Sequence, residues 1–169
     1  MATSQGAELA SLTGRDKIWA IAYDEWQRNP VFGYGPTLWN AEFRTSIAMP
    51  YATHGHNQFM DTLSRSGSVG AVSLVLYSLV LLALSIRYTR QSGGLSLALF
   101  LAIAMRSVSE VPLALFGYNL EVIAQALLLA VLAGCAVEVA AKNRLLADSR
   151  RYAPPSRKPI TPLAARSVP

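Results

Sequence analysis

The sequence is poor in charge and in cysteine, and both shortages exclude whole classes of protein. Charged residues make up 15% of the 169 residues, whereas 52% are hydrophobic. Soluble domains carry about 25% charged residues. The single cysteine, Cys135, excludes an intrachain disulfide, a four-cysteine zinc site and a CxxC redox motif. The composition therefore argues against disorder and against an ordinary cytosolic enzyme, and it indicates a membrane protein.

Common nucleotide-binding and metal-binding motifs are also missing. The sequence FGYGP at 32–36 is followed by no Lys-Ser or Lys-Thr pair, and no GxGxxG is present, so neither a P-loop nor a dinucleotide fold is predicted. The two histidines, His54 and His56, have Asp61 nearby but no clear third ligand. We therefore predict no metal and no cofactor. The first twenty residues hold no apolar segment of the signal-peptide type.

Positive charge is concentrated at the C-terminal end. Residues 142–169 carry a net charge of +6, whereas the rest of the chain carries −1. Such a tail can bind nucleic acid or anionic lipid. After hydrophobic helices, however, it is typical of a cytoplasmic tail under the positive-inside rule, so we expect membrane lipid and no nucleic acid as a partner. Five of the nine prolines lie in this tail, which predicts disorder.

Three apolar stretches predict an all-α, multi-pass membrane fold with about three transmembrane helices. Each approaches the roughly 20 residues needed to cross the hydrocarbon core of a bilayer. The stretches are 66–86, 95–114 and 122–141. The second contains Arg106 and Glu110, whose spacing places them on one helix face, where they can pair. Either this helix ends near Met105, or both charges face protein and water near a membrane surface; we favour the second interpretation.

Cations between and after these stretches predict the orientation. Arg87 and Arg90 follow the first stretch, and the basic tail follows the third, so both can lie in the cytoplasm. The chain then divides into an extracytoplasmic region at 1–66, a three-helix membrane region at 67–141 and a basic tail at 142–169.

Residues 1–66 carry signals of ordered helices. Thr13 and Asp16 form a helix start, and Asn29-Pro30 ends a helix predicted over 14–28. A turn follows, and a second short helix is predicted over 58–66, with Gly67 as its stop signal. The three tryptophans of this region either stack on sugars or, as we favour, pack in a core or at a membrane interface.

Two residues of this region suit polar chemistry. Arg15 lies in the first turn of the predicted helix, where backbone N–H groups and a guanidinium favour an anion such as phosphate. The alternative is a solvent-facing Arg15 or a salt bridge to Asp16 or Asp24. His56 precedes the second short helix, and a neutral imidazole is suited to take a proton from a sugar hydroxyl. The alternative is a loop histidine bonded to backbone.

Two segments, TGRDKIWAIAYDEWQRNPVFGYG at 13–35 and HGHNQFMDTLSRSGSVG at 54–70, resemble the O-antigen ligase and polysaccharide polymerase superfamily of bacterial membrane proteins. The second segment matches that family's motif of His, then Asn, Ser or Gln, nine residues, then GxxG. In this sequence the motif begins at His56 and Asn57 and ends at Gly67–Gly70. The resemblance covers about residues 12–140 and is somewhat closer to exopolysaccharide production proteins than to ligases.

The resemblance implies a multi-pass glycosyltransferase of the bacterial inner membrane. Such enzymes move a glycan from undecaprenyl pyrophosphate to a glycan or lipid acceptor on the periplasmic face, without a nucleotide sugar or an essential metal. It assigns His56 to activation of the acceptor hydroxyl and Arg15 to the donor pyrophosphate. Asn57, Arg106 and Glu110 are expected to be substrate-binding, with the last two orienting the helices near the site.

The chain departs from this family in the number of its spans, which is about ten or more in family members. We therefore expect a C-terminal fragment, inactive alone, which is a truncated gene product, a split subunit or the result of a misassigned start. A protein supplying the missing N-terminal helices is then a partner. The alternative is a non-catalytic membrane subunit that binds a glycan or a partner enzyme. A small transporter subunit is disfavoured because the strongest motifs lie outside the spans.

Overall fold

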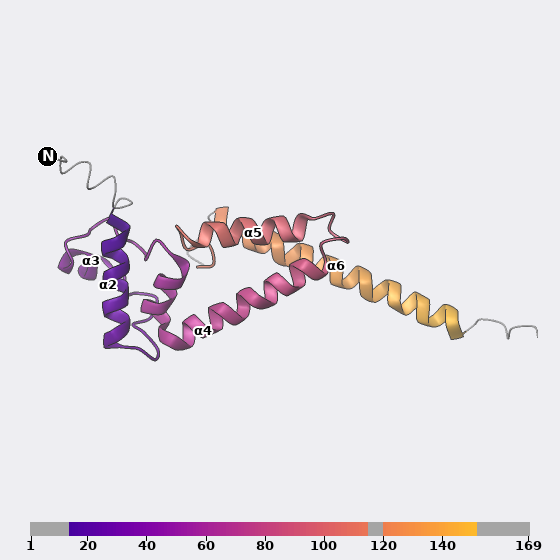
Figure 1. Ribbon diagram of the computed structural model, residues 1–169, viewed down its shortest axis with the longest axis horizontal. Helices are drawn as coiled ribbons and strands as arrows, with labels where there is room; N and C mark the ends of the chain where they lie inside the picture. The colour runs from indigo at the N-terminus through magenta and orange to yellow at the C-terminus, as the bar shows by residue number, and fades with distance from the viewer. Residues whose placement is uncertain (1–13, 115–119, 152–169) are drawn as a thin grey trace, which may run out of the picture. The chain divides into compact units, whose positions relative to one another are not determined.

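The computed structural model describes residues 14–114 and 120–151, and every regular element among them is a helix (Figure 1). This confirms the predicted all-α class. In chain order the helices are α2 (Arg15–Arg28), α3 (Ala41–Ser46), α4 (Gln58–Arg87), α5 (Leu95–Ser107) and α6 (Leu120–Arg151).

Helix α2 forms where the sequence predicts it and organises a small core. It begins after Gly14, which adopts a left-handed conformation with φ 78° and provides no side-chain cap. The predicted cap, Thr13, lies outside the described residues. Ile18 and Ala22 are buried on one face of α2, as their helical spacing predicts. They pack in one cluster with Leu38, Trp39, Met49 and Ala52.

Helix α4 is interrupted at Gly67, where φ is 61° and ψ is −161°. This conformation is essentially restricted to glycine. The predicted stop signal is therefore confirmed as a break in the backbone. The helix nevertheless resumes, so the predicted short helix and the first predicted span form one element that continues to Arg87.

A loop at 30–35 fills this break and pairs the backbone groups that it exposes. Pro30 and Val31 accept hydrogen bonds from the backbone N–H groups of Ser68 and Val69, at 2.8 and 3.2 Å. On the other side of the break, the N–H groups of Tyr34 and Gly35 donate to the carbonyls of residues 64 and 65, at 3.2 and 2.7 Å. The loop thus satisfies backbone groups that a helix end leaves unpaired.

Glycine is required where the loop and the helix meet. A Cβ atom on Gly67 would overlap the carbonyl of Val31, and one on Gly33 would overlap the backbone of Arg65. The predicted turn at FGYG is confirmed, and its glycines permit the close approach of two backbones. The backbone of residues 29–35 (Asn-Pro-x-x-Gly-x-Gly) therefore packs directly against α4 at the start of the GxxG segment, 67–70.

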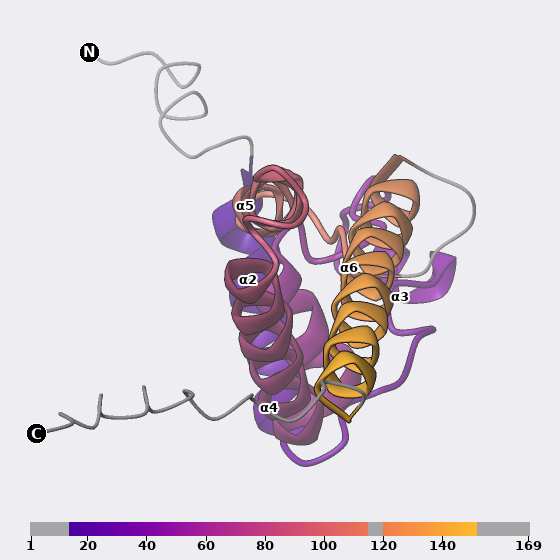
Figure 2. The same ribbon diagram turned by 90° about the vertical axis from the view of Figure 1, so that its right-hand side faces the viewer.

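Helices α4 and α5 pack against one another as a hairpin (Figures 1 and 2). Ser96 on α5 is fully buried, and its Oγ donates to the carbonyl of Ser85 on α4 at 2.9 Å. Helix α5 ends at Ser107, close to the end at Met105 that one of our two interpretations gives. Arg106 and Glu110 also both face protein side chains, as the other interpretation expects. Arg106 pairs with Glu121 at 3.0 Å rather than with Glu110, and the predicted i,i+4 pair is wrong because Glu110 lies beyond the helix end.

Two helices of the described residues, rather than three, are long and apolar enough to cross a membrane. They are α4 and α6, whereas α5 has 13 residues and spans only about 20 Å. By length and composition the described residues thus support two of the about three predicted spans, and the third stays a prediction. Helix α5 nevertheless brings the chain back toward the start of α4, where Asn57 donates a hydrogen bond to the carbonyl of Val108.

The chain divides into two compact units, residues 1–136 and 137–169. In the second unit, α6 continues to Arg151. The prediction of an irregular tail from residue 142 is therefore wrong for 142–151, where helix-forming residues such as Leu145 and Leu146 extend the helix although both are exposed. The rest of the predicted tail, 152–169, lies outside the described residues.

Candidate active site

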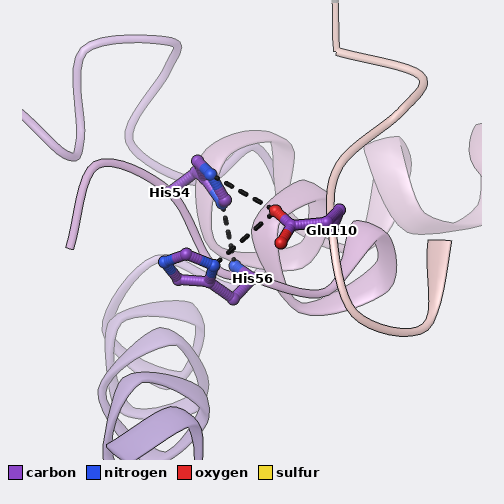
Figure 3. Close-up of side chains that lie close together, drawn as sticks. All are labelled: His54, His56 and Glu110. Carbon is purple, nitrogen blue, oxygen red and sulfur yellow. Dashed lines mark hydrogen bonds and ion pairs between the residues drawn. The ribbon is translucent and has the colours of Figure 1, made fainter. Parts of the chain in front are cut away.

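Four polar side chains from three distant parts of the sequence, Arg15, His54, His56 and Glu110, converge in the first unit. Figure 3 shows three of them, the two histidines and Glu110. Glu110 is at their centre. Its Oε2 lies 3.7 Å from His54 Nε2 and 3.7 Å from His56 Nδ1, and its Oε1 lies 3.7 Å from Arg15 Nη2. All four side chains are between 22% and 30% exposed, so the cluster is shielded but open to a ligand.

Two residues at the start of α4, Asn57 and Gln58, position Glu110. Asn57 caps α4 by accepting from the N–H of Met60 at 3.0 Å, and its Nδ2 donates to the carbonyl of Val108 at 3.0 Å. Gln58 Oε1 accepts from the N–H of Leu113 at 2.8 Å. These two side chains hold residues 108–113 on both sides of Glu110 and so place its carboxylate beside the histidines.

The loop that carries the histidines is tightly constrained. His56 has a φ of 46°, a left-handed conformation that is uncommon for a residue other than glycine and that occurs often at functional sites. Its N–H donates to His54 Nδ1 at 3.1 Å. Gly55 is buried between them, and a Cβ there would lie 2.9 Å from the backbone nitrogen of Asp61.

A buried ion pair on α4 fixes this loop, and the sequence analysis missed it. Arg65 Nε donates to both carboxylate oxygens of Asp61, at 3.1 and 3.0 Å, and Asp61 Oδ1 accepts from the N–H of Gly55 at 2.8 Å. The guanidinium of Arg65 also donates to the carbonyls of Pro36 and Thr53. The sequence does carry a signal for this pair, because the i,i+4 spacing of Asp61 and Arg65 allows them to pair on one helix face.

The electrostatics of the cluster keep His54 neutral near pH 7. Burial lowers the pKa of His54 below its usual 6.5, the neighbouring His56 lowers it further, and the carboxylates of Asp61 and Glu110 oppose the shift. Because His54 Nδ1 accepts a hydrogen bond, the proton of the neutral ring resides on Nε2. That N–H faces Glu110.

His56 is the residue best placed to accept a proton from a ligand. Its Nδ1 is buried and has no hydrogen-bond partner among the described residues, and Glu110 is the nearest carboxylate. A gap of 3.7 Å is longer than a hydrogen bond, but catalytic contacts often tighten only when a ligand closes the site. When Nδ1–H faces the carboxylate, the lone pair of the other ring nitrogen, Nε2, is free to act as a base.

Three of these side chains also have the donor atoms of a metal site. His54, His56 and Glu110 offer three ligand atoms within 4.8 Å of one another, so the expectation that no third ligand exists is wrong. However, His54 Nε2 carries a proton in this arrangement and is a donor rather than a ligand. The Arg15 guanidinium already faces the same carboxylate. The cluster therefore fits proton exchange better than cation binding.

The structure brings together three of the five residues that the sequence analysis selected. Arg15, His56 and Glu110 meet, and Arg15 pairs with Glu110 rather than with Asp16 or Asp24. Asn57 lies beside the cluster as a helix cap, whereas Arg106 is directed to Glu121. Their functional roles stay predictions.

Comparisons with known proteins agree with the motifs. No curated protein and no solved structure matches the chain. Residues 1–75 match a family model described as O-antigen ligase. The matched part includes Arg15, both histidines and the GxxG segment, and it ends within α4. The motif-based resemblance is thereby confirmed over residues 1–75, which match the O-antigen ligase family.

Proposed function

We propose that this chain is part of a membrane glycosyltransferase that moves a glycan from undecaprenyl pyrophosphate to a hydroxyl group of an acceptor sugar. The observation that supports this most is the convergence of Arg15, His56 and Glu110. It supplies an anion-binding group, a base and a carboxylate to hold that base. Glycosyl transfer from a pyrophosphate needs these three functions.

In the proposed reaction His56 accepts the proton of the acceptor hydroxyl through Nε2. The acceptor oxygen then forms a bond to the anomeric carbon of the donor glycan, while the bond from that carbon to the pyrophosphate oxygen breaks. The lipid pyrophosphate leaves with the bonding electron pair. Glu110 stabilises the imidazolium that forms, as a carboxylate does in histidine-dependent hydrolases. Glu110 is thus a positioning residue rather than the substrate-binding residue that the sequence analysis expected.

Arg15 is proposed to bind the donor pyrophosphate. Its contact with Glu110 is 3.7 Å long and its side chain is 30% exposed, so the pair contributes only about 0–1 kcal/mol. A pyrophosphate carries more negative charge than a carboxylate and accepts the bidentate fork of a guanidinium. Arg15 can therefore turn from Glu110 to the donor with little loss of stability.

The proposed location is the bacterial inner membrane, with the cluster on the periplasmic side. The cluster lies at the start of α4, and Arg87 and Arg90 lie at the other end of that helix. The positive-inside rule favours the cytoplasmic side for these arginines, which supports the proposed periplasmic location of the cluster. The distance of about 30 Å spanned by the 20 residues after Gly67 matches a bilayer core.

The test is substitution in a complete enzyme, formed by co-expressing this chain with a protein that supplies further transmembrane helices of the family. His56→Ala is expected to lower glycan transfer at least 100-fold, and Glu110→Gln to lower kcat with little change in KM. Asp24→Asn, an exposed change on α2, is the control and should transfer glycan normally. Retained transfer by His56→Ala, with normal membrane insertion, would refute the catalytic role.

A further inference from the structure

A groove lies next to the cluster and shares His54 with it. Its volume is about 330 Å³, at the lower end of small-molecule sites. One wall comes from the turn before α3 and the other from the loop before α4. The lining residues are Pro36, Thr37, Trp39, Asn40, Thr53, His54 and Arg65.

The two walls are joined by Arg65, so the groove is a built feature rather than a gap between loops. Arg65 is only 8% exposed, and its guanidinium donates to the carbonyl of Pro36 on one wall and of Thr53 on the other. Asp61 in turn holds the guanidinium, because both of its carboxylate oxygens accept from Arg65 Nε. A groove fixed in this way loses little entropy when it binds a ligand.

The lining combines apolar area with exposed polar groups and carries little net charge. Trp39 is 5% exposed, and its Nε1 has no hydrogen-bond partner among the described residues. Asn40 caps α3 through Oδ1, which leaves its amide donors for solvent or a ligand, and Thr53 is an exposed hydroxyl. The charge of Arg65 is balanced by Asp61.

We propose that this groove binds a neutral saccharide, the end of the acceptor glycan. A sugar ring presents an apolar C–H face suited to an aromatic wall and hydroxyls suited to Asn and Thr side chains. A charged ligand such as a phosphate would meet no uncompensated cation here. Because His54 belongs to both groove and cluster, a sugar in the groove has hydroxyls beside the His56 base. The proposal rests on the proposed function, and it identifies where the acceptor rather than the donor binds.

The experiment measures sugar binding by the full chain in lipid nanodiscs, with saturation-transfer-difference NMR. The probes are maltotriose, cellotriose and chitotriose, and pentaethylene glycol is the non-sugar control. At least one saccharide is expected to bind saturably. Thr53→Val, which keeps the side-chain shape, and Asn40→Asp, which keeps the helix cap but removes the amide donors, should each weaken binding about five- to tenfold. Thr45→Val on α3, outside the groove, is the matched control and should bind as the unmodified chain does.

Two results would overturn the proposal: no saccharide binding above that of pentaethylene glycol, or unchanged binding by both Thr53→Val and Asn40→Asp. His56→Ala separates this proposal from the proposed function. It should keep saccharide binding within twofold while glycan transfer in the complete enzyme is lost. If the unmodified chain binds saccharide but the unmodified complete enzyme transfers no glycan, the groove stays assigned and the proposed function is refuted.

Discussion

Removing Asp61 should destabilise the region that carries the cluster more than removing Asp61 and Arg65 together. Asp61 is 2% exposed and Arg65 is 8% exposed. Asp61→Ala leaves a buried guanidinium without its carboxylate and the N–H of Gly55 without its acceptor. Breaking a buried pair in this way costs about 3–5 kcal/mol.

Replacing both residues removes the uncompensated charge. In Asp61→Ala/Arg65→Met the carbonyls of Pro36 and Thr53 also lose their donor. Pro36 and Thr53 are exposed residues, so water can bond to their carbonyls in place of Arg65. The double variant should therefore lose only about 2 kcal/mol, mainly from the unpaired N–H and imperfect packing.

Tryptophan fluorescence is the suitable assay for this comparison. All three tryptophans lie between residues 19 and 39, so their emission reports the region around α2 and not the membrane helices. Denaturant titration in detergent micelles gives the free energy of unfolding of each variant. Asp24→Ala, at an exposed position of α2, is the control and should change stability by less than about 0.5 kcal/mol. If Asp61→Ala costs under about 1 kcal/mol, or if the double variant is the less stable one, the ion pair does not hold the histidine loop.

Three further perturbations probe the break in α4, the histidine loop and the hairpin. Gly67→Ala places a Cβ on the Val31 carbonyl in a conformation restricted to glycine. It should lower the free energy of unfolding, measured by denaturant titration, by about 3 kcal/mol or more. The control is Gly134→Ala, which should be neutral or slightly stabilising because no atom lies within 4 Å of its added Cβ. Because the pKa of His54 is lowered in the folded state, the unfolded chain binds more protons, so stability is complete above about pH 6.5 and falls as the pH drops below it. The protection factor of the Gly55 amide, which is corrected for the intrinsic exchange rate at each pH, should then fall, and His54→Gln should abolish that dependence. Ser96→Ala removes the buried bond to Ser85 and should lower thermal stability by about 0.5–1.5 kcal/mol, and an unchanged melting temperature would show that this bond does not hold the hairpin.

The local elements of this chain could be predicted from the sequence because local signals determine them. Helical spacing of Ile18 and Ala22, and the Asn29-Pro30 stop, predict a helix over 14–28, which begins one residue before α2 and ends with it. Gly67 signals a break in α4. The continuation of α6 to Arg151 was not predicted, because positive charge and nearby prolines suggested an end before Leu145 and Leu146. Charge indicates solvent exposure, but it does not end a helix made of good helix formers.

The candidate site could be predicted only in part because Glu110 reaches it through tertiary contacts. In the sequence, Glu110 follows Arg106 by four residues, and that spacing predicts a pair only while the helix continues. The helix ends at Ser107, and the next residues are held instead by Asn57 and Gln58, more than fifty positions earlier in the chain. Hydrophobic or charge periodicity in the sequence does not predict a contact between residues so far apart in the chain. Since the family match covers residues 1–75, it includes both holding side chains but not the carboxylate that they position. Replacing Gln58 by Leu should therefore lower glycan transfer in the complete enzyme through displacement of Glu110, with the same selective loss of kcat as Glu110→Gln; a variant that changes KM alone would show that Gln58 does not act through this carboxylate.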